Sequence, residues 1–329
     1  MRQLLNTIKN KIIILSGEPN SINSEIIYKC WKKLPSKIKR KIYFISNYKL
    51  LKKQLDKLGY SLKITKIENI FENEDNNNLK LINIDLNFKN PFKVNKRETR
   101  NYILKSLNLA HKIVTENKNI AGIINCPISK PSLNNKGFGV TEYLAKKCAI
   151  QNNSEVMLIR NNNLAVSPIT THNKIKDISK KLKKNLIVNK VKKINSWFKE
   201  KLKKTPKIAI LGLNPHNAEL KKDSEEVKII LPAIKNLKQK GLNVKGPYVA
   251  DTIFINEYKK FDVIVGMYHD QVLAPFKTLY KYNAVNLTLG LNYPRLSPDH
   301  GVAIDLIGKN KANASSLIEC INFLNKRHK

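Results

Sequence analysis

Short runs of apolar residues alternate with longer segments of helical periodicity along much of this chain. Turn residues bound each apolar run, which is typical of buried strands. The longer segments repeat their apolar positions with the helical period, which is typical of helices that cover a sheet. The predicted strands are Lys11–Ser16, Lys41–Ser46, Ile120–Asn125, Glu155–Arg160, Lys207–Leu211 and Phe261–Gly266. The predicted helices are Asn23–Leu34, Lys49–Leu58, Arg97–Thr115, Lys174–Lys203 (with a break near Asn185) and Ser224–Lys240.

This alternation predicts an α/β fold with mainly parallel sheets. The 329 residues are 42% hydrophobic, which is enough for a substantial core and too apolar for a disordered chain. No apolar run approaches the ~18–20 residues that cross a bilayer. The apolar stretch near the start, Ile12–Leu15, is too short for a signal-peptide core. We therefore expect a cytoplasmic protein without membrane segments.

The charge is strongly positive, with 61 Lys and Arg residues against 25 Asp and Glu residues and a net charge of +36. Such an excess suggests nucleic acid, an anionic membrane or an anionic substrate as a partner. The lysines are spread over the whole chain, and no nucleic-acid recognition signature is present. A solvated basic surface is therefore favoured over specific nucleic-acid binding. The four cysteines are too far apart in sequence for a metal or redox motif, which predicts reduced, mostly buried thiols.

Three of the six histidines follow a predicted strand or a short apolar run: His172, His216 and His269. In parallel α/β folds, ligands bind beyond the carboxyl ends of the strands. Three imidazoles around an open position are a common catalytic arrangement for a divalent metal. The alternative is that each is an ordinary hydrogen-bonded loop residue, and spacing alone does not decide between the two.

The strings around these histidines resemble those of the PdxA family, the 4-hydroxythreonine-4-phosphate dehydrogenases of vitamin B6 biosynthesis. The resemblance runs in the expected order from Gly17 to about Asn313. The strings LGLNPH and MYHDQ are specific when they occur together. The segments that carry the resemblance are Thr170–His172, Leu211–His216, Gly246–Pro247, Ala250–Thr252, Met267–Gln271, Ala284–Leu291 and Asp299–Gly301 followed by Asp305.

The resemblance implies a two-domain α/β/α fold like that of isocitrate and isopropylmalate dehydrogenases, with the active-site cleft between the domains. It also implies a homodimer with the active site at the interface. We expect residues 1–125 and 255–329 to form a discontinuous domain that carries the dinucleotide loop. Residues 126–254 are expected to form a central domain with the metal and dimer contacts.

The resemblance further implies an NAD-dependent (or NADP-dependent), metal-dependent oxidoreductase. Its reaction would oxidise the 3-hydroxyl of 4-phosphooxy-L-threonine and release carbon dioxide, giving 3-amino-2-oxopropyl phosphate for pyridoxal 5'-phosphate biosynthesis. His172, His216 and His269 would bind the metal, which is zinc, magnesium or cobalt. His300, Gly301 and Asp305 would lie in the dinucleotide loop, and the alternative is a structural loop in which Gly301 serves the backbone. The residues expected to contact the substrate are Thr141, Lys277, Asn286 and Arg295.

The chemistry also needs a proton acceptor, and Asp270 and Asp251 are the candidates. Each has an alternative role. Asp270 is placed to orient His269, and Asp251 to cap the helix that begins at Thr252. Lys277 is the third candidate catalytic residue, as a cation suited to a carboxylate or phosphate.

Three segments depart from the family pattern. Val140 stands where the family usually has a substrate-contacting histidine, and valine donates no hydrogen bond. The loops Gly17–Glu25 and Asn217–Lys221 carry side chains where the family is rich in glycine. These changes keep two alternatives open. The first is a dehydrogenase of the same fold for another phosphorylated hydroxy acid, such as threonate or erythronate phosphate, and the second is a diverged, non-catalytic paralogue.

Overall fold

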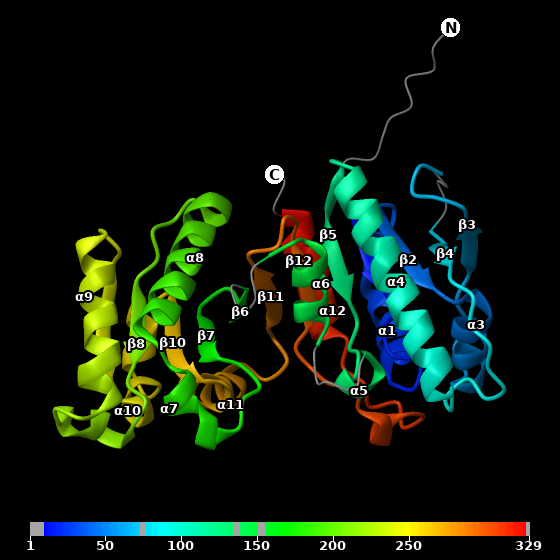
Figure 1. Cartoon of the computed structure of the whole chain (residues 1–329). Coiled ribbons are helices and arrows are strands. Elements are labelled where there is room, and N and C mark those ends of the chain that lie inside the picture. The colour runs from blue at the N-terminus through cyan, green and yellow to red at the C-terminus, as the bar shows by residue number, and fades with distance from the viewer. Residues whose placement is uncertain (1–9, 73–76, 134–138, 151–154, 327–329) are drawn as a thin grey trace, which may run out of the picture. The chain divides into compact units, whose positions relative to one another are not determined.

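A computed structural model describes residues 10–72, 77–133, 139–150 and 155–326. It has an α/β fold in which mostly parallel strands are covered by helices, as predicted (Figure 1). The chain divides into two compact units. Unit 1 consists of Met1–Ala149 and Leu291–Lys329, and unit 2 is Ile150–Gly290.

The sheet of unit 1 has the strand order β3-β4-β2-β1-β5-β12. Its neighbouring strands pair in parallel, so their carboxyl ends lie at one edge. β12 joins this sheet beside β5 although it follows unit 2 in the chain. The bounds are β1 Lys11–Leu15, β2 Ile42–Ser46, β3 Ile64–Ile67, β4 Leu79–Asn83, β5 Ile120–Asn125 and β12 Arg295–Pro298.

Helices cover both faces of this sheet. Alternate side chains of β1 point to opposite faces, and all of them are buried. Ile13 and Leu15 belong to one core cluster with Tyr102 and Leu107 of α4. On the other side, α12 contacts β5 and β12 and also packs against α1. The helices of unit 1 are α1 Asn23–Lys33, α2 Ser36–Lys39, α3 Tyr48–Lys57, α4 Lys96–Glu116, α5 Lys130–Leu133, α6 Val140–Lys147, the 3-10 turn η5 Ile304–Leu306 and α12 Ser315–Lys326.

The sheet of unit 2 has the strand order β11-β6-β7-β10-β8-β9. β6 runs antiparallel to both of its neighbours, whereas β7, β10, β8 and β9 are parallel. The carboxyl ends of β7, β8 and β10 therefore share one edge. The bounds are β6 Val156–Arg160, β7 Ala165–Thr170, β8 Ile208–Leu211, β9 Val244–Tyr248, β10 Val263–Tyr268 and β11 Val285–Leu289.

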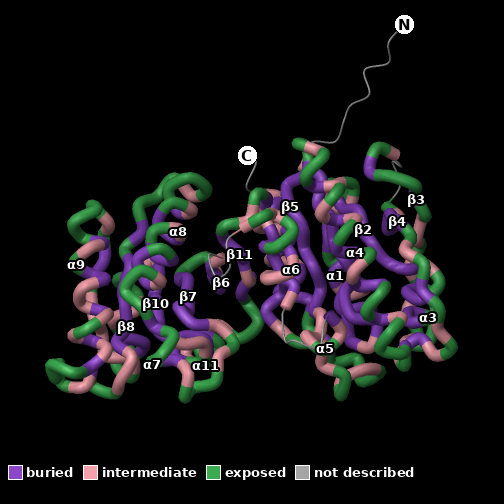
Figure 2. Tube along the Cα trace, in the orientation of Figure 1, coloured by how far each residue is buried: buried purple, intermediate pink, exposed green. Residues whose placement is uncertain are grey.

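The core of unit 2 is also layered. Ile264 of β10 shares a cluster with Val272 and Phe276 of α11, while α8 contacts β6, β7 and α9. Figure 2 shows the resulting pattern, in which β7, β8 and β10 are buried and the outer sides of the helices are exposed. The helices are η1 Ile175–Asp177, α7 Ile178–Lys181, α8 Lys184–Leu202, η2 Pro215–Leu220, the π-helical turn η3 Glu226–Ile230, α9 Leu231–Gln239, α10 Ala250–Ile253, η4 Glu257–Lys260 and α11 His269–Tyr280.

All six predicted strands are present, and the predicted helices differ in detail. The segment expected as one helix over Lys174–Lys203 is interrupted between Lys181 and Lys184, slightly before the predicted break near Asn185. The segment expected as a helix from Ser224 begins as the π-helical turn η3. The helix expected over Lys174–Lys203 has two parts because Leu182, between α7 and α8, is extended and buried.

The boundaries of the two units lie at 149/150 and 290/291, later in the chain than the predicted 125/126 and 254/255. The first boundary falls later because α5 and α6 pack on α4 of unit 1. The second falls later because β10, α11 and β11 complete the sheet of unit 2 and its covering layer.

The thiols of Cys30, Cys126 and Cys320 are buried and unbridged, as predicted, and Cys148 is half-buried. Among the described ranges, no helix combines the length and apolar character that a bilayer crossing requires.

Candidate active site

Hydrogen bonds connect the strand ends that carry the three candidate metal ligands of unit 2. The Thr170 hydroxyl, at the end of β7, donates to the Met267 carbonyl of β10 (2.7 Å). The Gln271 side chain accepts from the Met267 amide (2.6 Å) and donates to the Gly212 carbonyl after β8 (2.8 Å). These bonds hold the loops that lead to His172, His216 and His269 at one edge of the sheet.

His172 and His269 lie side by side, with ring centroids 5.4 Å apart. The Nδ1 atom of His269 lies 2.6 Å from Oδ1 of Asp270. A carboxylate on one imidazole nitrogen fixes the tautomer and directs the other nitrogen toward a ligand. This contact between Asp270 and Nδ1 of His269 is the one that an orienting role for Asp270 requires. The chemistry of these donors fits a divalent cation.

His216 is exposed on η2 and has a different setting. From His216 to Leu220 the φ angles lie between 47° and 56°, a left-handed turn built from non-glycine residues. His172 also has a positive φ, of 43°. Residues held in this region commonly mark functional sites. Within the described ranges, no three His, Cys, Asp or Glu side chains are close enough together to hold a metal. The structure thus brings His172 and His269 together and leaves His216 outside that pair.

The remaining candidates of unit 2 lie on three different elements. Asp251 lies in the first turn of α10, a helix that contacts η2. The helix N-cap is Val249, so the predicted capping role of Asp251 is wrong. Lys277 is exposed on α11, and Asn286 is half-buried on β11 opposite Ile159.

Thr141 and Arg295, the candidate substrate contacts of unit 1, touch each other. Arg295 is buried and donates from Nε to Oδ1 of Asn125 (2.7 Å) and from Nη1 to the hydroxyl of Thr141 (3.1 Å). Burial lowers the pKa of Arg295 to about 10, and the charge of Glu142 opposes this shift. The guanidinium therefore stays charged at neutral pH. The neighbouring Val140 is buried in the core cluster of unit 1.

The predicted dinucleotide loop is attached to the start of α1. Ile22 donates from its amide to the Val302 carbonyl (3.2 Å). His300 is half-buried, and its Nδ1 lies 3.0 Å from the Gly301 carbonyl oxygen, while Asp305 is exposed on η5. A Cβ atom at Gly301 would meet open space. Crowding therefore gives no reason for a glycine at position 301.

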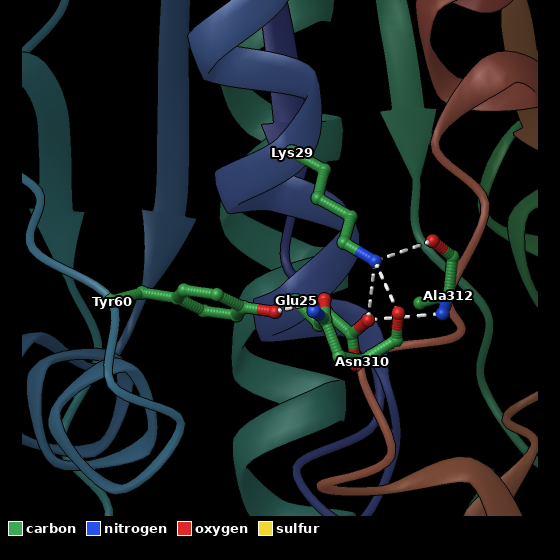
Figure 3. Close-up of polar contacts among 5 residues, drawn as sticks. All are labelled: Glu25, Lys29, Tyr60, Asn310 and Ala312. Atoms are coloured by element: carbon green, nitrogen blue, oxygen red, sulfur yellow. Dashed lines mark hydrogen bonds and ion pairs between the residues drawn. The ribbon is translucent and has the colours of Figure 1, made fainter.

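A polar network fixes the segment that follows this loop (Figure 3). Glu25 of α1, which is 1% exposed, accepts from the Ala312 amide (2.9 Å) and pairs with Lys29 (2.7 Å). Lys29 also donates to the carbonyls of Asn310 (3.0 Å) and Ala312 (3.1 Å). The Tyr60 hydroxyl donates to the Asn310 side chain (2.6 Å). An ion pair between the buried Glu25 carboxylate and the half-buried Lys29, with several hydrogen bonds, thus anchors residues 310–312 on α1.

The first loop and the loop after β5 are also joined. Gly17 has a φ of 75°, and a Cβ atom there would lie 2.6 Å from the Pro127 carbonyl oxygen. Glu18 is buried and accepts from the amide (3.3 Å) and hydroxyl (3.2 Å) of Ser129. Burial raises the pKa of Glu18, and its bonds to Ser132 and Ser129 oppose this shift. Position 17 needs a glycine, because its φ is positive and a Cβ atom would collide with the Pro127 carbonyl oxygen.

Asn125, Glu226 and Gln271 were not predicted individually as site residues, although each holds a candidate site residue or its loop in place. Gln271 stands two residues after His269 within a recognised string, so its position was a usable signal. Asn125 ends a predicted strand, where ligand-binding residues are expected. Glu226 lies in a polar helical segment and gives no sequence signal of burial.

Comparison with known proteins agrees with these motifs. A family model described as pyridoxal phosphate biosynthetic protein PdxA matches residues 37–324. The 4-hydroxythreonine-4-phosphate dehydrogenase of Sulfurihydrogenibium sp. (strain YO3AOP1) is 41% identical over 319 residues, covering 94% of this chain and 96% of that protein. That of Aquifex aeolicus (strain VF5) is 36% identical over 326 residues, covering 96% of this chain and 98% of that protein.

A solved structure gives the same result. The crystal structure of 4-hydroxythreonine-4-phosphate dehydrogenase from Klebsiella pneumoniae superposes with a TM-score of 0.83 at 26% identity, covering 97% of this chain and 100% of that chain. The chain therefore belongs to the PdxA family of pyridoxal phosphate biosynthetic proteins, the family that its motifs resemble.

Proposed function

We propose that this protein is a 4-hydroxythreonine-4-phosphate dehydrogenase of the cytoplasm that acts in pyridoxal 5'-phosphate biosynthesis. It would oxidise the 3-hydroxyl of 4-phosphooxy-L-threonine with NAD or NADP, and loss of carbon dioxide would give 3-amino-2-oxopropyl phosphate. The observation that carries the proposal is the His172–His269 pair, with Asp270 on His269, in a chain of this family.

His172, His216 and His269 are the residues that would hold a divalent cation, whether zinc, cobalt or magnesium. Such a cation would supply Lewis-acid polarisation of the substrate hydroxyl. Asp270 keeps the His269 ring in one orientation through its contact with Nδ1. This contact leaves Asp251, which is exposed on α10, as the preferred acceptor for the hydroxyl proton.

Cationic and polar side chains would bind the ends of the substrate. Arg295 keeps its charge while buried and is held by Asn125 and Thr141, which suits a fixed site for a phosphate or carboxylate. Lys277 offers an exposed ammonium group, and Asn286 a side-chain amide. We assign the dinucleotide to the segment with His300, Gly301 and Asp305, and we propose that the protein acts as a homodimer.

The position of Val140 favours a second candidate. Valine has no hydrogen-bond donor in its side chain, where the family usually has a histidine, and Val140 is 7% exposed within the core of unit 1. A dehydrogenase of the same fold acting on another phosphorylated hydroxy acid, such as threonate or erythronate phosphate, would not need that donor.

The test is NADH formation by the purified protein with NAD and a divalent metal, using these three phosphorylated acids as substrates. We expect activity with 4-phosphooxy-L-threonine that is lost with a chelator and in His216→Ala. Activity with threonate or erythronate phosphate alone would select the second candidate. Absence of NADH with every substrate, and of NADPH when NADP replaces NAD, from a folded and metal-loaded protein would refute both.

A further inference from the structure

A buried carboxylate lies beneath the loop that carries His216. Glu226, the first residue of η3, is 0% exposed. Its Oε1 atom accepts from the backbone amides of Leu213 (2.7 Å) and Asn214 (2.8 Å). Its Oε2 atom accepts from the side-chain amide of Asn214 (3.0 Å). One carboxylate thus fixes two consecutive peptide groups just before Pro215 and His216.

The loop is closely packed around this carboxylate. A Cβ atom at Gly212 would lie 3.1 Å from Oε1 of Glu226 and 2.0 Å from Oδ1 of Asn217. Asn217 in turn donates to the Pro247 carbonyl (3.1 Å), and Gln271 donates to the Gly212 carbonyl (2.8 Å). The loop is therefore held from three sides, by η3, by β9 and by the start of α11.

The loop needs this support because its backbone is strained. Each non-glycine residue in the left-handed region costs roughly 1–2 kcal/mol. The run from His216 to Leu220 contains five such residues in succession. Strain of this kind persists only where the surroundings over-determine it. Glu226 supplies bonds to a charged acceptor, which are stronger than bonds between neutral groups.

Glu226 is also ionised. Burial alone would raise the pKa of Glu226, but the hydrogen bonds from Asn214 and Leu213 outweigh burial and lower it below the usual 4.5. A π-helical turn such as η3 is rare and often occurs at functional sites.

We propose that Glu226 is a positioning residue for His216: by fixing the peptide groups of Leu213 and Asn214, it sets the main-chain conformation that leads to this candidate metal ligand. The inference rests on the proposed metal-binding role of His216. Glu226 would thus support His216 as Asp270 would support His269. Glu226 contacts backbone amides before His216, whereas Asp270 contacts the His269 ring itself.

The test measures Co²⁺ and Zn²⁺ affinity by calorimetry on the full-length protein, without reference to catalysis. We expect Glu226→Ala to weaken binding by about 10–100-fold, as is usual for residues that support a metal ligand. Glu226→Gln should weaken it less, because one oxygen remains for the two backbone amides. The matched control is Glu225→Gln, since Glu225 contacts the Asn214 side chain (2.8 Å) without contacting its backbone, and it should leave the affinity unchanged.

Thermal unfolding of the same variants separates positioning from simple stability. A merely structural residue would lower Tm while the folded protein kept its metal affinity, and that result would overturn the inference. If Glu226→Ala does not fold, Glu226→Gln decides in the same way. Metal binding that His216→Ala leaves intact would refute the proposed ligand set itself. Binding that requires His216 but ignores Glu226 would refute only the positioning role.

Discussion

Arg295 and Glu226 carry the two buried charges on which the proposed roles of single residues depend most. Each is almost fully removed from water, and each meets hydrogen-bonding partners of the right kind. Arg295 is held by two side chains from other elements, and Glu226 by backbone and side-chain donors of one loop. Removing one partner of such a group leaves a charge unsatisfied, so these positions tolerate little change.

The pH dependence of stability follows from the lowered pKa of Glu226. A carboxyl group whose pKa is lower in the folded protein contributes stability above its unfolded pKa and loses it as the pH falls through the folded pKa. We therefore expect the free energy of unfolding to fall as the pH drops below about 4.5, with a shallower fall in Glu226→Gln. Urea unfolding across this range measures it. An identical pH profile in the variant would contradict the lowered pKa.

Val140 gives a second prediction at this scale. Val140→His would place a polar ring in the core of unit 1, which costs roughly 1–3 kcal/mol when it lacks a hydrogen-bond partner. We expect lower stability in urea and no gain in dehydrogenase activity. Lys146→His, at an exposed position of the same helix, is the control. A clear rise in activity with 4-phosphooxy-L-threonine would mean that the ring reaches the substrate.

At the scale of elements, the sequence predicted the strands that contain an unbroken run of apolar residues and missed strands in which polar residues, Gly or Pro interrupt the run. β1 contains the unbroken apolar run Ile12–Leu15, β5 the run Ile120–Ile124, and β10 is apolar nearly throughout. β9 contains a Gly-Pro pair and β12 ends with Pro298, and both residue types normally argue against a strand. The tertiary fold overrides these local preferences. The pairing of His172 with His269 followed from their places at strand ends, whereas the support from Glu226 depends on contacts that no spacing reveals.

The network of Figure 3 leads to a prediction at the same scale. Glu25→Gln and Lys29→Met should loosen residues 310–312, because each removes a charged partner of their backbone. If the dinucleotide binds the preceding loop, KM for NAD should rise several-fold while metal affinity stays unchanged. Steady-state kinetics and calorimetry measure the two quantities. Lys32→Met, an exposed change on α1, is the control. An unaltered KM for NAD in both variants would separate this network from cofactor binding.

At the scale of the whole molecule, the net charge of +36 is the dominant feature. Repulsion among so many like charges destabilises the compact state, and salt screens it. We expect Tm to rise as sodium chloride is added at neutral pH. Differential scanning calorimetry at increasing ionic strength measures this shift. A Tm that falls with salt would show that local ion pairs, such as Lys29–Glu25, outweigh the overall repulsion.

The place of β12 in the sheet of unit 1 has a consequence for synthesis on the ribosome. β5 is made before residues 150–290, but its partner β12 emerges only after them. Unit 2 is continuous in sequence, so all of its strands have left the ribosome once Gly290 leaves the exit tunnel. It can therefore finish folding first, while β5 still presents an open edge that is prone to intermolecular pairing. The nascent chain is thus most exposed to aggregation, and most in need of chaperones, during the interval in which unit 2 is being translated.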